Sequence, residues 1–161
     1  MKKTIFALMA ITVLGLAACQ KTETPDSEPT AAETASGTYT GTMEIALNDG
    51  APFELPDQTI TITAAGESSI DLTIADFALG EFTLGTISMT GCSLMENATD
   101  GSITTESEQT ITVGEIGDCA IKLEGTFKDN STTLDLQISP SILTINVSVH
   151  FDGVRAETDA E

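Results

Sequence analysis

The stretch GTYTGTMEIAL, residues 37–47, carries apolar side chains on every second position. Its odd positions hold Tyr39, Met43, Ile45 and Leu47, whereas its even positions are mostly threonine. Successive side chains of an extended chain point to opposite faces, so a period of two predicts a β-strand with one buried face. We therefore expect the folded part of the chain to begin at Gly37 with a strand that contributes one face to a core.

The same alternation returns along most of the remaining chain. Clear examples are TITIT at 59–63, SIDLTI at 69–74, CAIKLEGTF at 119–127, TLDLQIS at 133–139 and LTINVSVHF at 143–151. Short segments rich in glycine and polar residues separate these runs, and no segment shows a helical period. The pattern predicts an all-β protein, a single up-and-down antiparallel β-barrel of about eight strands, because hairpin-length connections join sequential neighbours and closure removes exposed edges. A β-sandwich is the alternative.

In such a barrel the alternating apolar positions face inward. An eight-stranded barrel is just wide enough to be filled by side chains or to hold one small ligand. An apolar inner set fits a cavity for a hydrophobic ligand and equally fits a dry, packed core. The residues predicted to line the interior are Met43, Ile45, Ile60, Ile62, Ile70, Leu72, Phe82, Leu84, Met89, Ile121, Leu123, Leu134, Leu136, Ile145 and Val147.

The N-terminus has the features of an export signal. Lys2 and Lys3 precede a short apolar run, and LAAC at 16–19 supplies small residues at a cleavage site. LAAC resembles the lipobox of bacterial lipoproteins, which implies that residues 1–18 are removed and that Cys19 becomes a lipidated N-terminus. Among such lipoproteins, Gln20 after the cysteine points to the outer membrane rather than the inner one. The alternatives are a plain secretory signal and a single anchoring helix.

The rest of the chain divides by composition. Residues 19–36 have no large apolar side chain after the cysteine, so we expect a flexible acidic tether; the barrel occupies 37–153, and 154–161 form an acidic tail. With 25 acidic and 6 basic residues, the formal net charge is −19. This charge argues against a nucleic-acid partner, since affinity for nucleic acids comes from neutralising phosphates with Lys and Arg.

The reactive residues are few. Cys92 and Cys119 remain beside Cys19, and an oxidising compartment allows either a disulfide between them or two buried free thiols. His150 is the only histidine and falls on the outward face of its run, where it makes a poor general base and cannot hold a metal alone. We find no catalytic motif, so we expect no enzyme activity, no metal and no cofactor.

Beyond these patterns, the run from Gly37 to Gly153 resembles the calycin-like barrel domain of Bacteroidota lipoproteins. GTYTGTMEI, DLTIADFALGEFTLGTISM and VSVHFDG carry the resemblance. Lipocalins, in the wider calycin group, open with Gly-x-Trp, and a basic residue stacks on that Trp. The resemblance implies that Tyr39 takes the place of the Trp and that Arg155 closes the barrel base over it. A strand-end tyrosine and an arginine in a frayed tail are the alternative.

Two functions are compatible with these features. The resemblance implies a lipid-anchored envelope protein, on the cell surface or the periplasmic face, that binds a small hydrophobic ligand in or at the mouth of its barrel. The alternative is an accessory lipoprotein with a filled barrel that acts through contacts with another envelope protein. The sequence identifies no ligand and no oligomeric state.

Overall fold

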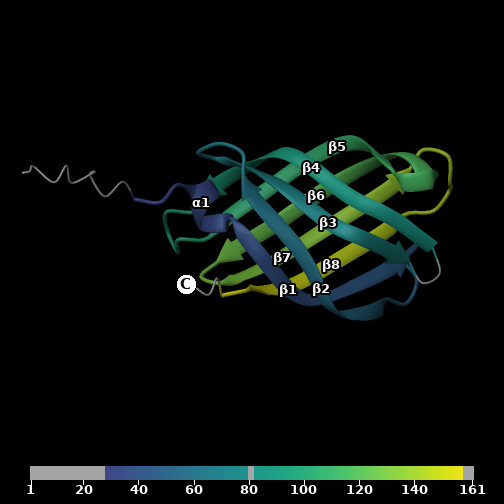
Figure 1. Ribbon diagram of the computed structural model, residues 1–161, viewed down its shortest axis with the longest axis horizontal. Helices are drawn as coiled ribbons and strands as arrows, with labels where there is room; N and C mark the ends of the chain where they lie inside the picture. The colour runs from purple at the N-terminus through teal and green to yellow at the C-terminus, as the bar shows by residue number, and fades with distance from the viewer. Residues whose placement is uncertain (1–27, 80–81, 158–161) are drawn as a thin grey trace, which may run out of the picture.

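The computed structural model of the protein describes residues 28–79 and 82–157. Most of these residues belong to extended strands, which follow one another with short connections (Figure 1). The elements in chain order are helix α1 (Ala31–Ala35), strands β1 (Gly37–Leu47), β2 (Phe53–Ala64), β3 (Ser69–Leu79), β4 (Phe82–Glu96) and β5 (Ile103–Val113), the 3₁₀ turn η1 (Gly114–Ile116), and strands β6 (Gly117–Lys128), β7 (Ser131–Pro140) and β8 (Val147–Arg155).

Within the described residues, the eight strands form a closed barrel in which each strand pairs antiparallel with the next. The last strand, β8, returns to pair antiparallel with β1 over Tyr39 to Leu47, which leaves no free edge between them. The prediction of an up-and-down antiparallel barrel is thus confirmed, and the alternative β-sandwich is wrong. Because sequential hairpins supply every pairing but one, the fold needs only one long-range closure.

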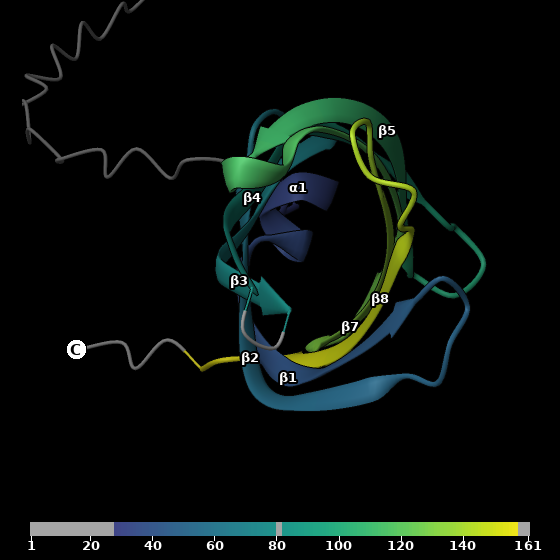
Figure 2. The ribbon, with the colours of Figure 1, turned by 90° about the vertical axis from the view of Figure 1, so that its right-hand side faces the viewer.

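The barrel has two distinct ends (Figure 1). One end, here called the α1 end, holds α1, the connections at 65–68, 97–102 and 129–130, and the end of β8. At the other, the distal end, the connections are 48–52, η1 and 141–146. Viewed from the distal end, α1 lies inside the outline of the ring of strands (Figure 2). The helix therefore covers one end of the barrel.

Helix α1 lies inside the range that the sequence assigns to a flexible tether. Thr30 and Glu33 form a capping box, in which the Thr30 side chain accepts from the Glu33 backbone and the Glu33 side chain accepts from the Thr30 backbone. The alanines of the helix are buried, and the Ala32 amide donates to the Glu67 carbonyl at 3.2 Å. Alanine has no large apolar side chain, so a hydrophobicity pattern misses a helix that packs through small residues.

Strand β1 approaches β8 very closely at Gly41. The register between β1 and β2 shifts between Gly41 and Met43, so the strand bends at this point. A Cβ atom on Gly41 would overlap the backbone carbonyl oxygen of Asp152 and lie 2.6 Å from the Cα of Gly153. The position requires glycine because the backbones of the first and last strands occupy the space that a side chain would need.

Candidate functional site

Tyr39 lies at the α1 end and is almost fully buried, with 1% of its surface exposed. Its hydroxyl donates to the Ala35 carbonyl at 2.9 Å, which ties the last turn of α1 to the first strand. Its ring lies 6.0 Å from that of Phe127 between centroids, with the planes tilted by 54°. The tyrosine therefore links the covering helix to the apolar interior through both its polar and its aromatic parts.

Arg155 lies opposite Tyr39 in the pairing of β1 with β8. Its Nη2 donates to the Tyr39 hydroxyl at 2.8 Å and also to the Thr34 carbonyl of α1, and its Cζ lies 5.4 Å from the tyrosine ring centroid. The structure thus brings together the two residues predicted to close the base. Strand β8 runs two residues past the predicted domain limit, so Arg155 lies in an ordered strand rather than in the tail.

Most of the predicted interior positions are buried, but Ile145 is not. That prediction is wrong: Ile145 is 37% exposed and lies in the connection before β8, because the ladders of β8 with β1 and with β7 both begin at Val147. Phe82 belongs to β4, but its side chain lies outside the described part of the structure. Buried apolar residues that the sequence pattern did not assign to the interior are Ile74, Phe77, Ile87, Leu94, Ile103, Val113, Phe127, Ile138, Val149 and Phe151.

The middle of the barrel is packed. Side chains from strands on all sides of it, including Met43, Ile70, Met89, Leu123 and Leu134, have 0% of their surface exposed. Accessible surface includes the walls of internal cavities, so a space that could hold a water molecule would leave exposed area on the side chains around it. None is left on these five residues, which contact other side chains as in an ordinary protein core.

At the distal end, the loop 141–146 is held by hydrogen bonds at both of its ends. The Ser141 amide donates to the Asp118 carbonyl at 2.8 Å. The Asn146 amide donates to the Asn48 side chain at 2.9 Å, and the Asn48 amide donates back to the Asn146 carbonyl at 2.9 Å. Asn48 adopts φ 49°, a left-handed conformation that asparagine tolerates well. These bonds position the loop beside the turn after β1.

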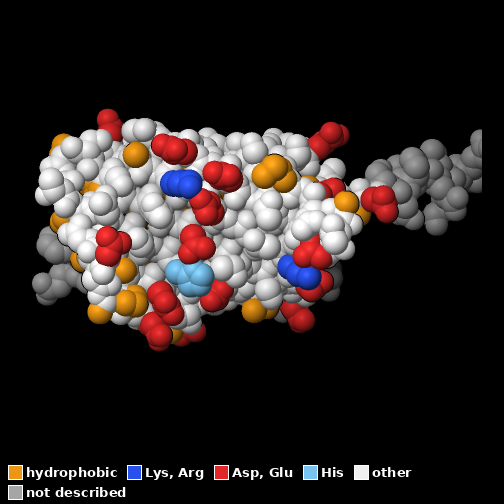
Figure 3. Space-filling view, turned by 180° about the vertical axis from the view of Figure 1, so that it is seen from behind, with side chains coloured by type: hydrophobic (Ala, Val, Ile, Leu, Met, Phe, Trp, Pro, Cys, Tyr) orange, Lys and Arg blue, Asp and Glu red, His pale blue; other side chains and the backbone are white. Residues whose placement is uncertain are grey.

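Large apolar side chains are exposed around this end of the molecule. They come from the end of β1, the start of β2 and the loop 141–146, and their exposed fractions run from 37% to 70%. Apolar side chains are visible at the same end, on the left in Figure 3. We call this set the distal rim: Leu47, Phe53, Ile142, Leu143 and Ile145.

The structure contradicts the predicted disulfide, because Cys92 and Cys119 are both free and buried. Cys92 lies in β4 and Cys119 in β6, with β5 between them. Cys119 pairs with Ile111 of β5, whereas β4 meets β5 at Ser93 and Glu106, five residues earlier on β5. Cys92 precedes Ser93 and is therefore level with Ser107, four residues before Ile111, so the cysteines are separated by about 13 Å along the strands. Bridging requires Cα atoms within about 7 Å.

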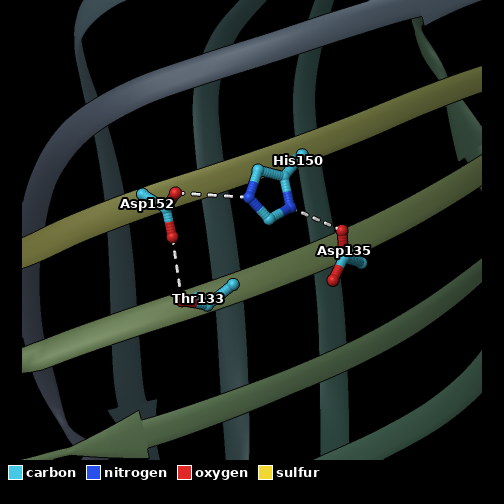
Figure 4. Close-up of polar contacts among 4 residues, drawn as sticks. All are labelled: Thr133, Asp135, His150 and Asp152. Atoms are coloured by element: carbon cyan, nitrogen blue, oxygen red, sulfur yellow. Dashed lines mark hydrogen bonds and ion pairs between the residues drawn. The ribbon is translucent and has the colours of Figure 1, made fainter.

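On the outer surface, His150 lies between two carboxylates (Figure 4). Its Nδ1 is 2.7 Å from Asp135 and its Nε2 is 3.2 Å from Asp152, while the Thr133 hydroxyl donates to the other oxygen of Asp152 at 2.8 Å. The hydrogen bond to Asp135 is the main cause that raises the pKa of His150 above its ordinary value. Both ring nitrogens face carboxylate oxygens, and the Thr133 hydroxyl is bound to Asp152 rather than to the imidazole, so the hydrogen bond between base and nucleophile that an activated hydroxyl needs is not formed among these residues.

Cys19, the predicted lipidation site, lies outside the described residues. In the part of the chain that the structure describes, no group of three or more His, Cys, Asp or Glu side chains is arranged to hold a metal ion. The one α-helix described, α1, is too short to cross a bilayer, and no other described segment forms a membrane-spanning helix.

Comparison with known proteins agrees with this architecture. A family model described as the calycin-like beta-barrel domain matches residues 35–154. No curated protein matches the sequence. The fold is similar to the crystal structure of a "putative outer membrane protein" from Bacteroides fragilis, with a TM-score of 0.63 and 16% identity. That similarity covers 76% of this chain and 51% of the other, so this chain spans about half the length of its structural neighbour.

Proposed function

The chain belongs to the calycin-like β-barrel domain family, and from this premise we propose that it is an envelope lipoprotein that binds a small hydrophobic ligand at the distal rim, without catalysis. The observation that supports the proposal most is the exposure of the five rim side chains at the barrel end opposite α1. An exposed apolar patch of a few hundred Å² on a soluble domain commonly marks a binding site.

The packed interior argues for the rim rather than the lumen as the place of binding. A ligand inside the barrel would have to displace fully buried side chains such as Met43, Ile70 and Leu123. Core packing is close to that of organic crystals, so such displacement costs several kcal/mol unless the ligand replaces every lost contact. Binding at the rim requires no such rearrangement.

Native mass spectrometry of protein purified without denaturation tests this function. We expect a retained small molecule in the wild type, and its loss in the double variant Ile142→Ser, Leu143→Ser. Met95→Ser is the matched control, because Met95 is also highly exposed but lies at the α1 end of β4. A bare mass for the wild type, together with no uptake of a hydrophobic dye, would count against the proposal.

We further propose that Cys19 is lipidated and anchors the domain in the outer membrane. The lipobox-like LAAC supports this, as does the name of the structural neighbour. Incorporation of labelled palmitate that disappears in Cys19→Ser would support the anchor. Its persistence in Cys19→Ser would contradict it, and protease treatment of intact cells would distinguish the cell surface from the periplasmic face.

A second candidate is an accessory lipoprotein with a filled barrel that acts through contacts with another envelope protein. The packed middle of the barrel favours it, because a filled lumen is what such a scaffold needs. In that case the distal rim would be a protein-docking surface, and co-purification of one defined partner, lost in Ile142→Ser, Leu143→Ser but kept in Met95→Ser, would support it.

A further inference from the structure

We infer that the distal rim selects a small cationic amphiphile, an apolar group that carries an ammonium or a similar positive charge. The inference rests on the proposed function and specifies the ligand class of the same site. It comes from the charges that surround the rim and from the size of the exposed apolar surface.

Carboxylates lie next to the apolar rim. Asp49 follows Leu47 in the exposed turn after β1, and Glu54 follows Phe53 at the start of β2. Asp118 is exposed at the start of β6, and its backbone carbonyl accepts from Ser141 at the first residue of the loop 141–146. The end of β1 and the start of β2 therefore each have a carboxylate within two positions of a rim residue. The loop 141–146 is bonded through its backbone to Asp118, whose exposed carboxylate accepts from the Thr112 hydroxyl at 2.7 Å.

Basic side chains are located elsewhere on the described part of the molecule. Lys128 and Arg155 end β6 and β8 at the α1 end, and Lys122 lies midway along β6, paired with Glu124 at 2.5 Å. The chain as a whole carries a formal charge of −19. The potential around the distal end is therefore negative, which favours a positive ligand group and disfavours an anionic head group or a second copy of this chain.

The size of the rim favours a small ligand over a protein partner. Its five side chains, between 37% and 70% exposed, present only a few hundred Å² of apolar surface. A standard protein interface takes ~800 Å² from each partner, whereas a single alkyl chain can be covered by a patch of this size. The occupant that fits both the apolar area and the surrounding charge is an amphiphile with one short apolar chain and a cationic head.

The test is titration calorimetry of the full soluble domain with decyltrimethylammonium, decanoate and decanol, below the concentrations at which they form micelles. The three probes share a ten-carbon chain and differ in head-group charge. We expect decyltrimethylammonium to bind about tenfold more tightly than decanoate at low salt, a difference of ~1.4 kcal/mol. This preference should shrink in 1 M salt, where the screening length falls to about 3 Å.

Substitution of carboxylates at one end or the other shows where the preference for the cationic probe arises. Asp49→Asn with Glu54→Gln should abolish most of the preference, whereas Glu96→Gln with Glu157→Gln, which removes the same formal charge at the α1 end, should retain it. Asp49→Asn is compatible with the backbone, since the residue has φ 58° and asparagine tolerates that conformation. An unchanged preference in the distal charge variant would overturn the inference.

The remaining outcomes separate the inference from the proposed function. Equal affinities for the three probes would overturn the cationic selection and leave binding at the rim intact. No binding of any probe would overturn both. A basic amphipathic peptide that bound more than tenfold tighter than decyltrimethylammonium would replace the small ligand with a protein segment, and so contradict the inference.

Discussion

At the α1 end, Tyr39 and Arg155 are hydrogen-bonded to each other and to carbonyl groups of α1, and these contacts close the barrel. At the distal end, by contrast, five large apolar side chains on and around the loop 141–146 remain exposed. The same eight strands run between the two ends. The difference arises from the segments that flank them: a capped helix of small residues at one end, and an apolar loop that extends beyond the strand pairing at the other.

We expect the α1 end to contribute mainly to the stability of the fold and the distal end mainly to binding. In the closure, Tyr39 is buried, Arg155 is half-buried and both are hydrogen-bonded to α1, so their loss should destabilise the fold. The side chains of the distal rim are exposed, so their truncation should change binding and leave stability almost unaltered. Substitutions at the two ends test this expectation. The largest difference in the free energy of unfolding is expected between the two aromatic residues.

The strongest expected contrast is between two aromatic residues at opposite ends. Tyr39→Ala should lower the free energy of unfolding by about 3–5 kcal/mol, the usual cost of truncating a buried aromatic side chain. Phe53→Ala, at a position 37% exposed, should cost under about 1 kcal/mol. Urea unfolding measures both. Similar losses for the two variants would show that the ends are not energetically distinct.

The packing between the two ends predicts slow thiol chemistry. Burial raises the pKa of both Cys92 and Cys119, which lowers the thiolate fraction, and both side chains have 0% of their surface exposed. Alkylation of the native protein should therefore be at least ~100-fold slower than in urea, because it waits for opening of the barrel. Rapid labelling of either cysteine in the native state would contradict a packed interior.

Truncation of Arg155 should destabilise the protein less than truncation of Tyr39. Arg155→Ala should cost about 1–2 kcal/mol, since it removes charge-assisted hydrogen bonds and a cation–π contact at a partly exposed site. Arg155→Lys should recover only part of this, because an ammonium lacks the planar fork of the guanidinium. Amide exchange in α1 should accelerate in both variants. Unchanged thermal stability of Arg155→Ala would refute the role of Arg155 in closing the base.

The smallest effect concerns His150, which lies on the outer wall between the ends. Asp135, Asp152 and the cross-strand Glu44 surround it, and its folded pKa is raised mainly by Asp135. A raised folded pKa means that its stabilisation is complete below about pH 6.5 and declines as the pH rises through the folded value. We expect ~0.2–1 kcal/mol for this exposed cluster. His150→Gln should remove the part of the pH dependence of stability that comes from this cluster. If the variant and the wild type had the same stability profile with pH, His150 would not be its source.

Alternation in the sequence predicted the barrel and most of its core, because each strand has one buried face and the side-chain period is exact. The resemblance to the calycin-like barrel, and not the alternation, predicted Tyr39 and Arg155 together at one end, where the structure pairs them in the closure of β1 with β8. The barrel follows from local pattern, whereas this contact was predicted only through the resemblance.

The distal rim and α1 were harder to predict for different reasons. Ile145 continues the alternation of Val147 and Val149, yet it lies outside the barrel because the pairing of β8 with both of its neighbours begins only at Val147, and alternation does not show where pairing begins. Helix α1 packs through alanines and is recognisable only by its capping box. The cysteine pairing failed because the stagger between strands is not visible in a single sequence.

The most direct test of binding at the distal rim is an NMR titration of methyl-labelled protein with decanol, an uncharged probe that does not depend on head-group selection. We expect shifts of the methyl resonances of Leu47, Ile142, Leu143 and Ile145, with those of Ile70, Leu72 and Ile121 unchanged. Shifts of the interior methyls, with the rim resonances unmoved, would place the ligand inside the barrel and contradict binding at the rim.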